Sequence, residues 1–316
     1  MHPAKSIVFF TTLTGAGFGL LALIGLFGVL GLLPAGGLSG AITMAICFAF
    51  IFAGLLSSTG HLSHRERAWR AFTQWRSSWL SREAVAAVLT LVPAGLFALG
   101  WVSFGAVFGW MRWAGALAGL CALFTIFTTG MIYASLKPVA EWHTPFTVPS
   151  YLIYGLMSGL TLLTAILAGL GALPRLLPLV AALLCIAGFF WKRASWRYNA
   201  QQVKLPSANA ATGLAEGTIC SVQWPHSSQN FLLKEMGFRI ARKHSRRLRI
   251  IAQCLGFLLP ALLLVLAQVL GGPGETALLI LSVAIELVGL LVERWLFFAE
   301  ATHTISLYYG LGASGA

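Results

Sequence analysis

The sequence predicts an all-α integral membrane protein with eight transmembrane helices, and three observations support this fold class. First, 58% of the 316 residues are hydrophobic and 9% are charged, whereas a soluble domain is about 45–50% apolar and about 25% charged. Second, eight apolar segments reach or approach the length of a bilayer crossing. Third, the Lys and Arg residues concentrate in the loops of one side. A chain with so few charges cannot expose most of its surface to water.

Each crossing of a hydrocarbon core about 30 Å thick needs about 20 apolar residues, because an α-helix rises about 1.5 Å per residue. The first segment exceeds the apolar core of about 7–15 residues in a cleaved signal peptide, so we expect it to be retained. The sixth segment is the shortest. The predicted spans are Ser6–Leu33, Leu38–Ser58, Ala84–Phe108, Trp113–Leu136, Tyr151–Leu173, Leu176–Trp191, Ile250–Leu270 and Thr276–Phe298.

The positive charges predict the orientation of these spans. With eight crossings, all of the 21 Lys and Arg except Arg112 and Arg175 fall on the side of the two termini. Basic loops are retained in the cytoplasm, so both termini should be cytoplasmic in a cytoplasmic (inner) membrane. A seven-helix or nine-helix model would break this segregation. We expect one polytopic membrane domain, residues 1–316, arranged as two four-helix bundles.

Three of the predicted spans carry pairs of glycines four residues apart. In a membrane, small residues at this spacing let two helices approach closely. We therefore expect helix contacts at Gly15 and Gly19, Gly115 and Gly119, and Gly155 and Gly159.

A cytoplasmic loop at residues 59–82 interleaves arginine with tryptophan. This mixture suits protein interfaces, lipid headgroups and nucleic acid. In a polytopic membrane protein it favours a partner protein and anionic lipids, and we expect no nucleic acid. The residues expected to dock the partner are Arg65, Arg70, Trp75, Arg76 and Trp79.

A second, longer cytoplasmic loop covers residues 192–249. It begins with a polar stretch and ends in a helix-like run from Phe231 to Arg249. Within this run Leu232, Met236 and Ile240 recur at fourfold spacing, while the other faces are basic. Such a pattern is typical of an interfacial helix on anionic lipid, here leading into the seventh span.

Several kinds of metal and redox site are excluded by composition and spacing. All nine acidic residues are Glu, so an aspartate-based metal, phosphoryl-transfer or protease site is absent. The five cysteines are too far apart for a C-x-x-C motif or an iron–sulfur ligand set. All seven histidines lie at helix ends or in loops, which disfavours a haem inside the membrane. We expect no metal, haem or cluster in this chain, so any electrons must come from another subunit.

His61 and Glu83 lie at the ends of the second and third predicted spans, on the cytoplasmic boundary. A lipid-soluble quinone needs hydrogen-bond partners and titratable groups beside an apolar channel, and this pair can supply them. The alternative interpretation is purely structural. His61 would then cap one helix C-terminus, and Glu83 would complement the dipole of the next helix.

Glu286, Glu293 and Glu300 recur at intervals of seven in the last span and its end. This spacing places the three carboxylates on one stripe about 21 Å long. An ionised Glu286 near mid-membrane would cost about 2.5–3.5 kcal/mol or more, so it should be protonated or paired. The stripe is either a proton route from the cytoplasm or an internal polar seam with Glu293 paired to a cation, and we favour the seam.

Two other classes of function stay open on these residues alone. Pro93, Glu286 and eight helices divisible into two fours are compatible with a secondary transporter, which binds substrate at broken helices near the midplane. A passive scaffold without a quinone site is the other alternative.

Several stretches of the sequence resemble the anchor-subunit family of dimethyl sulfoxide reductases, over nearly the whole chain. Within that family, the two long loops look most like those of the membrane subunits of cytoplasmic sulfite dehydrogenases. The matching stretches are Met1 to Ala4, Thr11 to Gly17, His61 to Phe72 with Ser81 to Glu83, Asn230 to Arg239, and Glu293 to Phe298 with Tyr308 to Gly310.

The resemblance implies an anchor for a molybdopterin catalytic subunit and an iron–sulfur subunit, which exchanges electrons with ubiquinone or menaquinone. The family's quinone residues map onto His61, Arg67 and Glu83, although Ser63 replaces a glycine of the family motif. In the sulfite interpretation, electrons pass from sulfite through the clusters to quinone. The reverse, quinol oxidation for a sulfoxide reductase, would use the same site.

Overall fold

The protein is described by a computed structural model, and the expected all-helical membrane fold is confirmed. The described residues are 5–61, 64–202 and 239–304, with 207, 209, 212–214, 217 and 219. Within them, eight helices are long and apolar enough to cross a membrane. They are α1 (Lys5–Leu30), α2 (Gly37–Ser58), α3 (Trp79–Phe104), α4 (Trp110–Ala134), α5 (Thr147–Gly169), α6 (Leu177–Gln202), the joined α9 (Arg239–Gln253), η3 (Cys254–Leu258) and α10 (Leu259–Leu270), and α11 (Glu275–Ala299).

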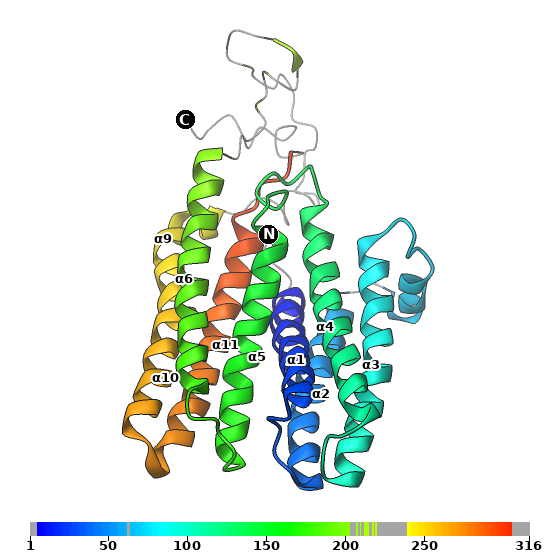
Figure 1. The fold of residues 1–316 in the computed structure, drawn as a ribbon. Coiled ribbons are helices and arrows are strands. Elements are labelled where there is room, and N and C mark those ends of the chain that lie inside the picture. The colour runs from blue at the N-terminus through cyan, green and yellow to red at the C-terminus, as the bar shows by residue number, and fades with distance from the viewer. Residues whose placement is uncertain are drawn as a thin grey trace.

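Helix α1 lies at the centre of the molecule and packs extensively against α2, α4 and α5 (Figure 1). Helices α3 and α4 pair on one side of it, while α6, α10 and α11 pack together beyond α5. The predicted glycine faces are confirmed as contacts. A Cβ on Gly19 would meet the backbone of Gly155, and one on Gly119 would meet the backbone of Ala22. Close approach of these backbones is what small residues permit in a membrane.

The two ends of the bundle differ in the connections they carry. The start of α1, the α2–α3 connection, the end of α6 and the start of α9 lie at one end (Figure 1). We call this the basic end, since most of the loop Lys and Arg belong to these segments. The α1–α2, α3–α4, α5–α6 and α10–α11 turns lie at the opposite end.

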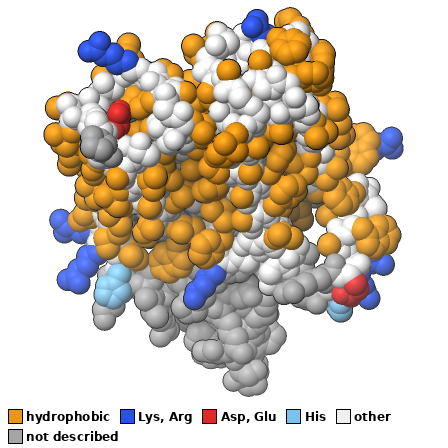
Figure 2. Space-filling model, turned by 90° about the horizontal axis from the view of Figure 1, so that it is seen from below, with side chains coloured by type: hydrophobic (Ala, Val, Ile, Leu, Met, Phe, Trp, Pro, Cys, Tyr) orange, Lys and Arg blue, Asp and Glu red, His pale blue; other side chains and the backbone are white. Residues whose placement is uncertain are grey.

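Large apolar side chains cover the flanks of the bundle. Leu89, Leu120 and Leu183 are 60%, 66% and 69% exposed, which suits contact with lipid rather than water. In Figure 2, hydrophobic side chains dominate the visible face and the Lys and Arg side chains lie at its margins.

Several helix limits differ from the prediction: α3 begins at Trp79 rather than Ala84, so the predicted 59–82 loop ends before it, and α5 begins at Thr147 rather than Tyr151. Helix α6 continues past Trp191 to Gln202, so the first part of the predicted 192–249 loop is helical. The physical reason is that Lys192 is buried against an acidic partner, which keeps this turn inside the protein. The basic run predicted from Phe231 is helical from Arg239, where α9 begins, and Phe231 to Phe238 lie outside the described residues.

Candidate functional site

The first candidate site is the rim formed by η1 (Thr59–His61), η2 (Arg65–Phe72) and the first turns of α3. Arg82 shapes this rim. Its Nε donates to the Trp75 carbonyl at 2.9 Å and its Nη2 to the Arg76 carbonyl at 2.7 Å. The guanidinium also lies 4.3 Å from the centroid of the Trp79 ring. These contacts fold the loop back onto the start of α3.

Glu83 points into the protein from this first part of α3. It is 6% exposed, and its Oε1 accepts a hydrogen bond from Thr129 Oγ1 of α4 at 2.5 Å. Among the residues that the structure describes, no ion pair to Glu83 is recorded. A carboxyl group buried at a helix start, with a hydroxyl for a neighbour, is well placed to exchange a proton with a ligand at the rim.

The other predicted quinone residues are placed less completely. His61 ends η1, which follows α2 directly, but its side chain lies outside the described part of the chain. The end of α2 is tied to α1, since Ser57 Oγ donates to the Ser6 carbonyl at 2.9 Å. Arg67 is exposed, and its recorded ion-pair neighbour is Glu66 at 3.9 Å rather than Glu83. The structure therefore buries Glu83 but leaves Arg67 at the surface.

The predicted docking residues lie on or beside an exposed surface of arginine–tryptophan pairs. Arg70 lies 5.8 Å from the ring centroid of Trp69, and Arg76 lies 5.3 Å from that of Trp75. Trp69 and Trp75 are 61% and 52% exposed. Trp79 is half-buried and packs edge-on against Phe127, with ring centroids 6.0 Å apart. The side chain of Arg65 lies outside the described part of the chain.

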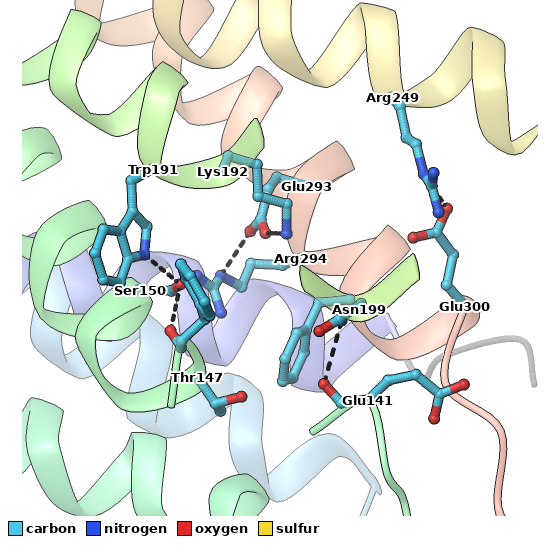
Figure 3. A network of polar contacts seen from close by, with 12 residues as sticks. Glu141, Thr147, Ser150, Trp191, Lys192, Asn199, Arg249, Glu293, Arg294 and Glu300 are labelled. Atoms are coloured by element: carbon cyan, nitrogen blue, oxygen red, sulfur yellow. Dashed lines mark hydrogen bonds and ion pairs between the residues drawn. The ribbon is translucent and has the colours of Figure 1, made fainter. Parts of the chain in front are cut away.

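A second polar site lies between α5, α6 and α11 near the basic end (Figure 3). Glu293 of α11 is 1% exposed and is paired with Lys192 of α6 and with Arg294, whose Nε lies 3.0 Å from Glu293 Oε2. We call these three residues the buried triad. The two cations outnumber the single carboxylate, so the triad carries a net positive charge, but each cation has the carboxylate beside it when buried.

Sequence reasoning misses the two cations of the triad. It assigns Lys192 to a loop, and it counts Arg294 only as a charge on the cytoplasmic side. The seven-residue spacing of Glu286, Glu293 and Glu300 was the signal that could have found them. A buried carboxylate facing the protein requires a cation on a neighbouring helix.

Aromatic rings and a further ion pair surround the triad. The Arg294 guanidinium lies 4.1 Å from the ring centroid of Tyr151 and 5.2 Å from that of Tyr154. The Tyr151 ring stacks on Tyr133 of α4, with centroids 5.7 Å apart and planes inclined by 11°. At the end of α11, Glu300 Oε1 pairs with Arg249 Nε at 2.7 Å.

Glu286 is the third member of the carboxylate stripe and lies deeper in the bundle. It is 1% exposed and lies beside Thr161, and within the described ranges neither of its carboxyl oxygens makes a well-formed hydrogen bond. The three glutamates of the stripe thus have different environments. Glu293 and Glu300 each face a cation, and Glu286 faces none that is recorded.

Two cavities adjoin the triad. The larger has a volume of about 180 Å³ and is lined by Glu141, Lys192, Arg249, Glu293, Arg294 and Glu300, among others. The smaller has a volume of about 10 Å³ and is lined by residues of α1, α5 and α11, including Thr12, Tyr151, Tyr154 and Arg294. In the described part of the chain, no group of three or more His, Cys and acidic residues is placed to hold a metal ion.

Comparison with known proteins identifies the family of this chain. The chain is 34% identical to a sulfite dehydrogenase subunit of Allochromatium vinosum, in an alignment that covers 98% of this chain and 99% of the relative. No solved structure shows significant similarity to it. The family model for the DMSO reductase anchor subunit, DmsC, matches residues 1–311. The chain therefore belongs to the DMSO reductase anchor subunit (DmsC) family and is a multi-pass membrane protein.

Proposed function

We propose that this chain is the membrane anchor and quinone-reactive subunit of a molybdopterin and iron–sulfur oxidoreductase complex, and that the complex oxidises sulfite with quinone. The substrate class follows the relative, which is named as part of a sulfite dehydrogenase. This chain would hold the quinone, and an iron–sulfur partner would bring electrons to it from the molybdopterin protein.

The observation that carries the quinone assignment is the burial of Glu83 at the rim. Its carboxyl group is shielded from water beside Thr129, at the end of the bundle that carries the Arg–Trp loop. A buried carboxyl group of this kind can hold a proton and release it to a reduced quinone oxygen. A purely dipole-complementing glutamate would instead be expected at the exposed surface of the first turn.

The orientation follows from the charges. The basic end faces the cytoplasm, with both termini there, because basic loops are retained on that side. The eight helices divide into two four-helix bundles that meet where α1 packs on α5. The exposed pairs of Trp69 with Arg70 and Trp75 with Arg76 then dock the iron–sulfur subunit beside the quinone site.

Each residue of the rim has a distinct role. Quinone becomes quinol by gaining two electrons, from the partner's clusters, and two protons. Glu83 and His61 pass these protons to the two quinone oxygens, and Arg67 attracts the polar head at the surface. Because the rim lies at the end that we place in the cytoplasm, the two protons are taken up from the cytoplasm.

The test is binding of a fluorescent quinol-site inhibitor to the complex purified with its partner subunits. The variants Glu83→Ala and His61→Ala should each weaken inhibitor binding and slow sulfite-dependent quinone reduction. Sulfite oxidation with ferricyanide, an acceptor that takes electrons without protons, should stay unchanged. Undiminished inhibitor binding in both variants would remove this site assignment.

The reverse direction is the second candidate, and the family model favours it because it describes the anchor of a DMSO reductase. Quinol would then give two electrons to the partner and two protons to Glu83 and His61. Reduced quinol analogue driving reduction of dimethyl sulfoxide, with no sulfite-dependent quinone reduction, would establish this direction.

A further inference from the structure

We infer that the larger cavity, the buried triad and the Tyr151–Tyr133 pair form a proton-uptake route from the basic end to Glu83. This inference rests on the proposed quinone function, because reduction of quinone consumes two protons at the rim. It goes further in assigning a path and the residues that line it.

The entrance of the route is the larger cavity. Its lining includes Arg249 and Glu300, whose side chains are 43% and 18% exposed, so this part is accessible from the surface. Three carboxylates and three cations line it, together with hydroxyl groups such as Thr147 and Ser150. The charges balance, so the cavity attracts neither an anion nor a cation strongly. A polar cavity of about 180 Å³ with many hydrogen-bond partners is suited to water.

The two cavities meet at Arg294, which lines both and, as a permanently charged donor, orders water there rather than carrying the proton itself. The smaller cavity, at about 10 Å³, is close to the volume that holds one water molecule. Thr12 Oγ1 near it has no hydrogen-bond partner within the described part of the protein, and Tyr151 OH and Tyr154 OH lie beside Arg294 and Ser150 without a well-formed hydrogen bond. A buried water usually makes two to four hydrogen bonds to such atoms. One water at this point satisfies the groups and joins the larger cavity to Tyr151.

The inner end of the route is the tyrosine pair. Tyr151 of α5 is stacked on Tyr133 of α4. Thr129, which donates to Glu83, lies one helical turn before Tyr133 on α4, so residues 129 and 133 share one face of that helix. The pair therefore connects the wall of the smaller cavity with the face of α4 that carries the donor to Glu83.

A competing path would lead toward the middle of the bundle instead of across it to Glu83. Ser158 also lines the smaller cavity, and Glu286, whose oxygens make no well-formed hydrogen bond within the described ranges, lies further along α11. A path through Tyr154 and Ser158 would end at Glu286 in the middle of the bundle. Tyr151 and Tyr154 therefore separate the two paths, because both line the cavity and only Tyr151 stacks on Tyr133.

The test compares Tyr151→Phe with Tyr154→Phe as the matched control, in the complex with its partner subunits. Each variant removes one hydroxyl and keeps the ring over Arg294. We expect Tyr151→Phe to slow quinone reduction about tenfold and to raise its solvent deuterium isotope effect, because proton delivery becomes limiting. Tyr154→Phe should leave both quantities within about twofold of the unchanged protein.

Two further measurements separate this inference from the function on which it rests. Inhibitor binding and ferricyanide reduction should be unchanged in Tyr151→Phe, since the quinone site and the partner are intact. Slowing by Tyr154→Phe and Glu286→Gln, with Tyr151→Phe unaffected, would overturn the route to Glu83. Equal rates of quinone reduction and equal isotope effects in Tyr151→Phe, Tyr154→Phe and Glu286→Gln would also overturn the route to Glu83. Failure of the quinone function would appear separately, as unchanged inhibitor binding in Glu83→Ala.

Discussion

At the scale of single residues, Glu83 and Glu293 show two ways to bury a carboxyl group. Glu293 lies between Lys192 and Arg294, so its negative charge is more than compensated within the bundle. Glu83 has a hydroxyl donor and no recorded ion pair within the described residues. The first arrangement suits a fixed structural charge, and the second suits a group that gains and loses a proton.

Removal of the Thr129 hydroxyl tests the environment of Glu83. Thr129→Val deletes the hydrogen bond to the carboxyl group, and a hydrogen bond to a charged group contributes about 1.5–3 kcal/mol. We expect weaker inhibitor binding and slower quinone reduction. Thr128→Val is the matched control, because Thr128 is equally buried and its hydroxyl donates only to the Thr125 carbonyl at 2.7 Å. Equal behaviour of the two variants would contradict a role for Thr129 at the site.

The buried triad makes a prediction about stability. Lys192→Met leaves Glu293 with one cation, and breaking a buried ion pair costs about 3–5 kcal/mol. We expect a clear fall in the thermal unfolding midpoint of the detergent-solubilised complex. The double variant Lys192→Met with Glu293→Gln should be less stable still, since it leaves Arg294 buried without its carboxylate partner. A single variant as stable as the unchanged protein would show that the pair contributes nothing.

At the scale of helices, the α1–α5 contact depends on the absence of side chains. A Cβ on Gly159 would meet the backbone of Gly19 and Leu20, and one on Gly19 would meet Gly155. This contact holds α1 between the two parts of the molecule, and so fixes the distance between Tyr151 and the rim. A substitution that moves α1 and α5 apart should therefore disturb the geometry of both candidate sites.

Gly159→Ala should therefore destabilise the fold, with overpacking of about 1–3 kcal/mol or more because backbone cannot move aside. Expression level and thermal stability in detergent are the measurements. Gly95→Ala in α3 is the matched control, since nothing lies within 4 Å of the Cβ it would gain. If both variants behave like the unchanged protein, the helices do not pack tightly at Gly159.

At the scale of the whole molecule, charge asymmetry is the basis of the orientation that we propose, and therefore of the side on which we expect partners to bind. The connections at the basic end carry the exposed Arg–Trp pairs and the mouth of the larger cavity. The opposite end carries Arg112 in the first turn of α4 and Arg175 in the α5–α6 connection. The docking, quinone reduction and proton uptake that we propose are all assigned to the basic end, so its orientation decides the side on which they take place.

Labelling of single cysteines in intact cells tests this orientation. In a variant without the native cysteines, Arg175→Cys should react with a membrane-impermeant maleimide added outside. Trp69→Cys should react only after the cells are opened, because Trp69 belongs to the basic end and is 61% exposed. The reverse pattern would place the docking surface outside the cytoplasm.

The sequence by itself determined the number of spans, the glycine contacts and the charge asymmetry. These depend on local composition: a bilayer requires a run of about 20 apolar residues, and small residues recur at helical spacing. It also placed Glu83 and Glu293 on helices, because periodicity along one helix is visible in one dimension.

Only the tertiary structure decided which groups face these carboxylates. Lys192 lies 101 residues from Glu293 in the chain, yet the two are paired. Tyr133 and Tyr151 approach each other because α4 packs on α5. Such contacts arise from the packing of whole helices, which depends on many side chains at once, so no local pattern encodes them.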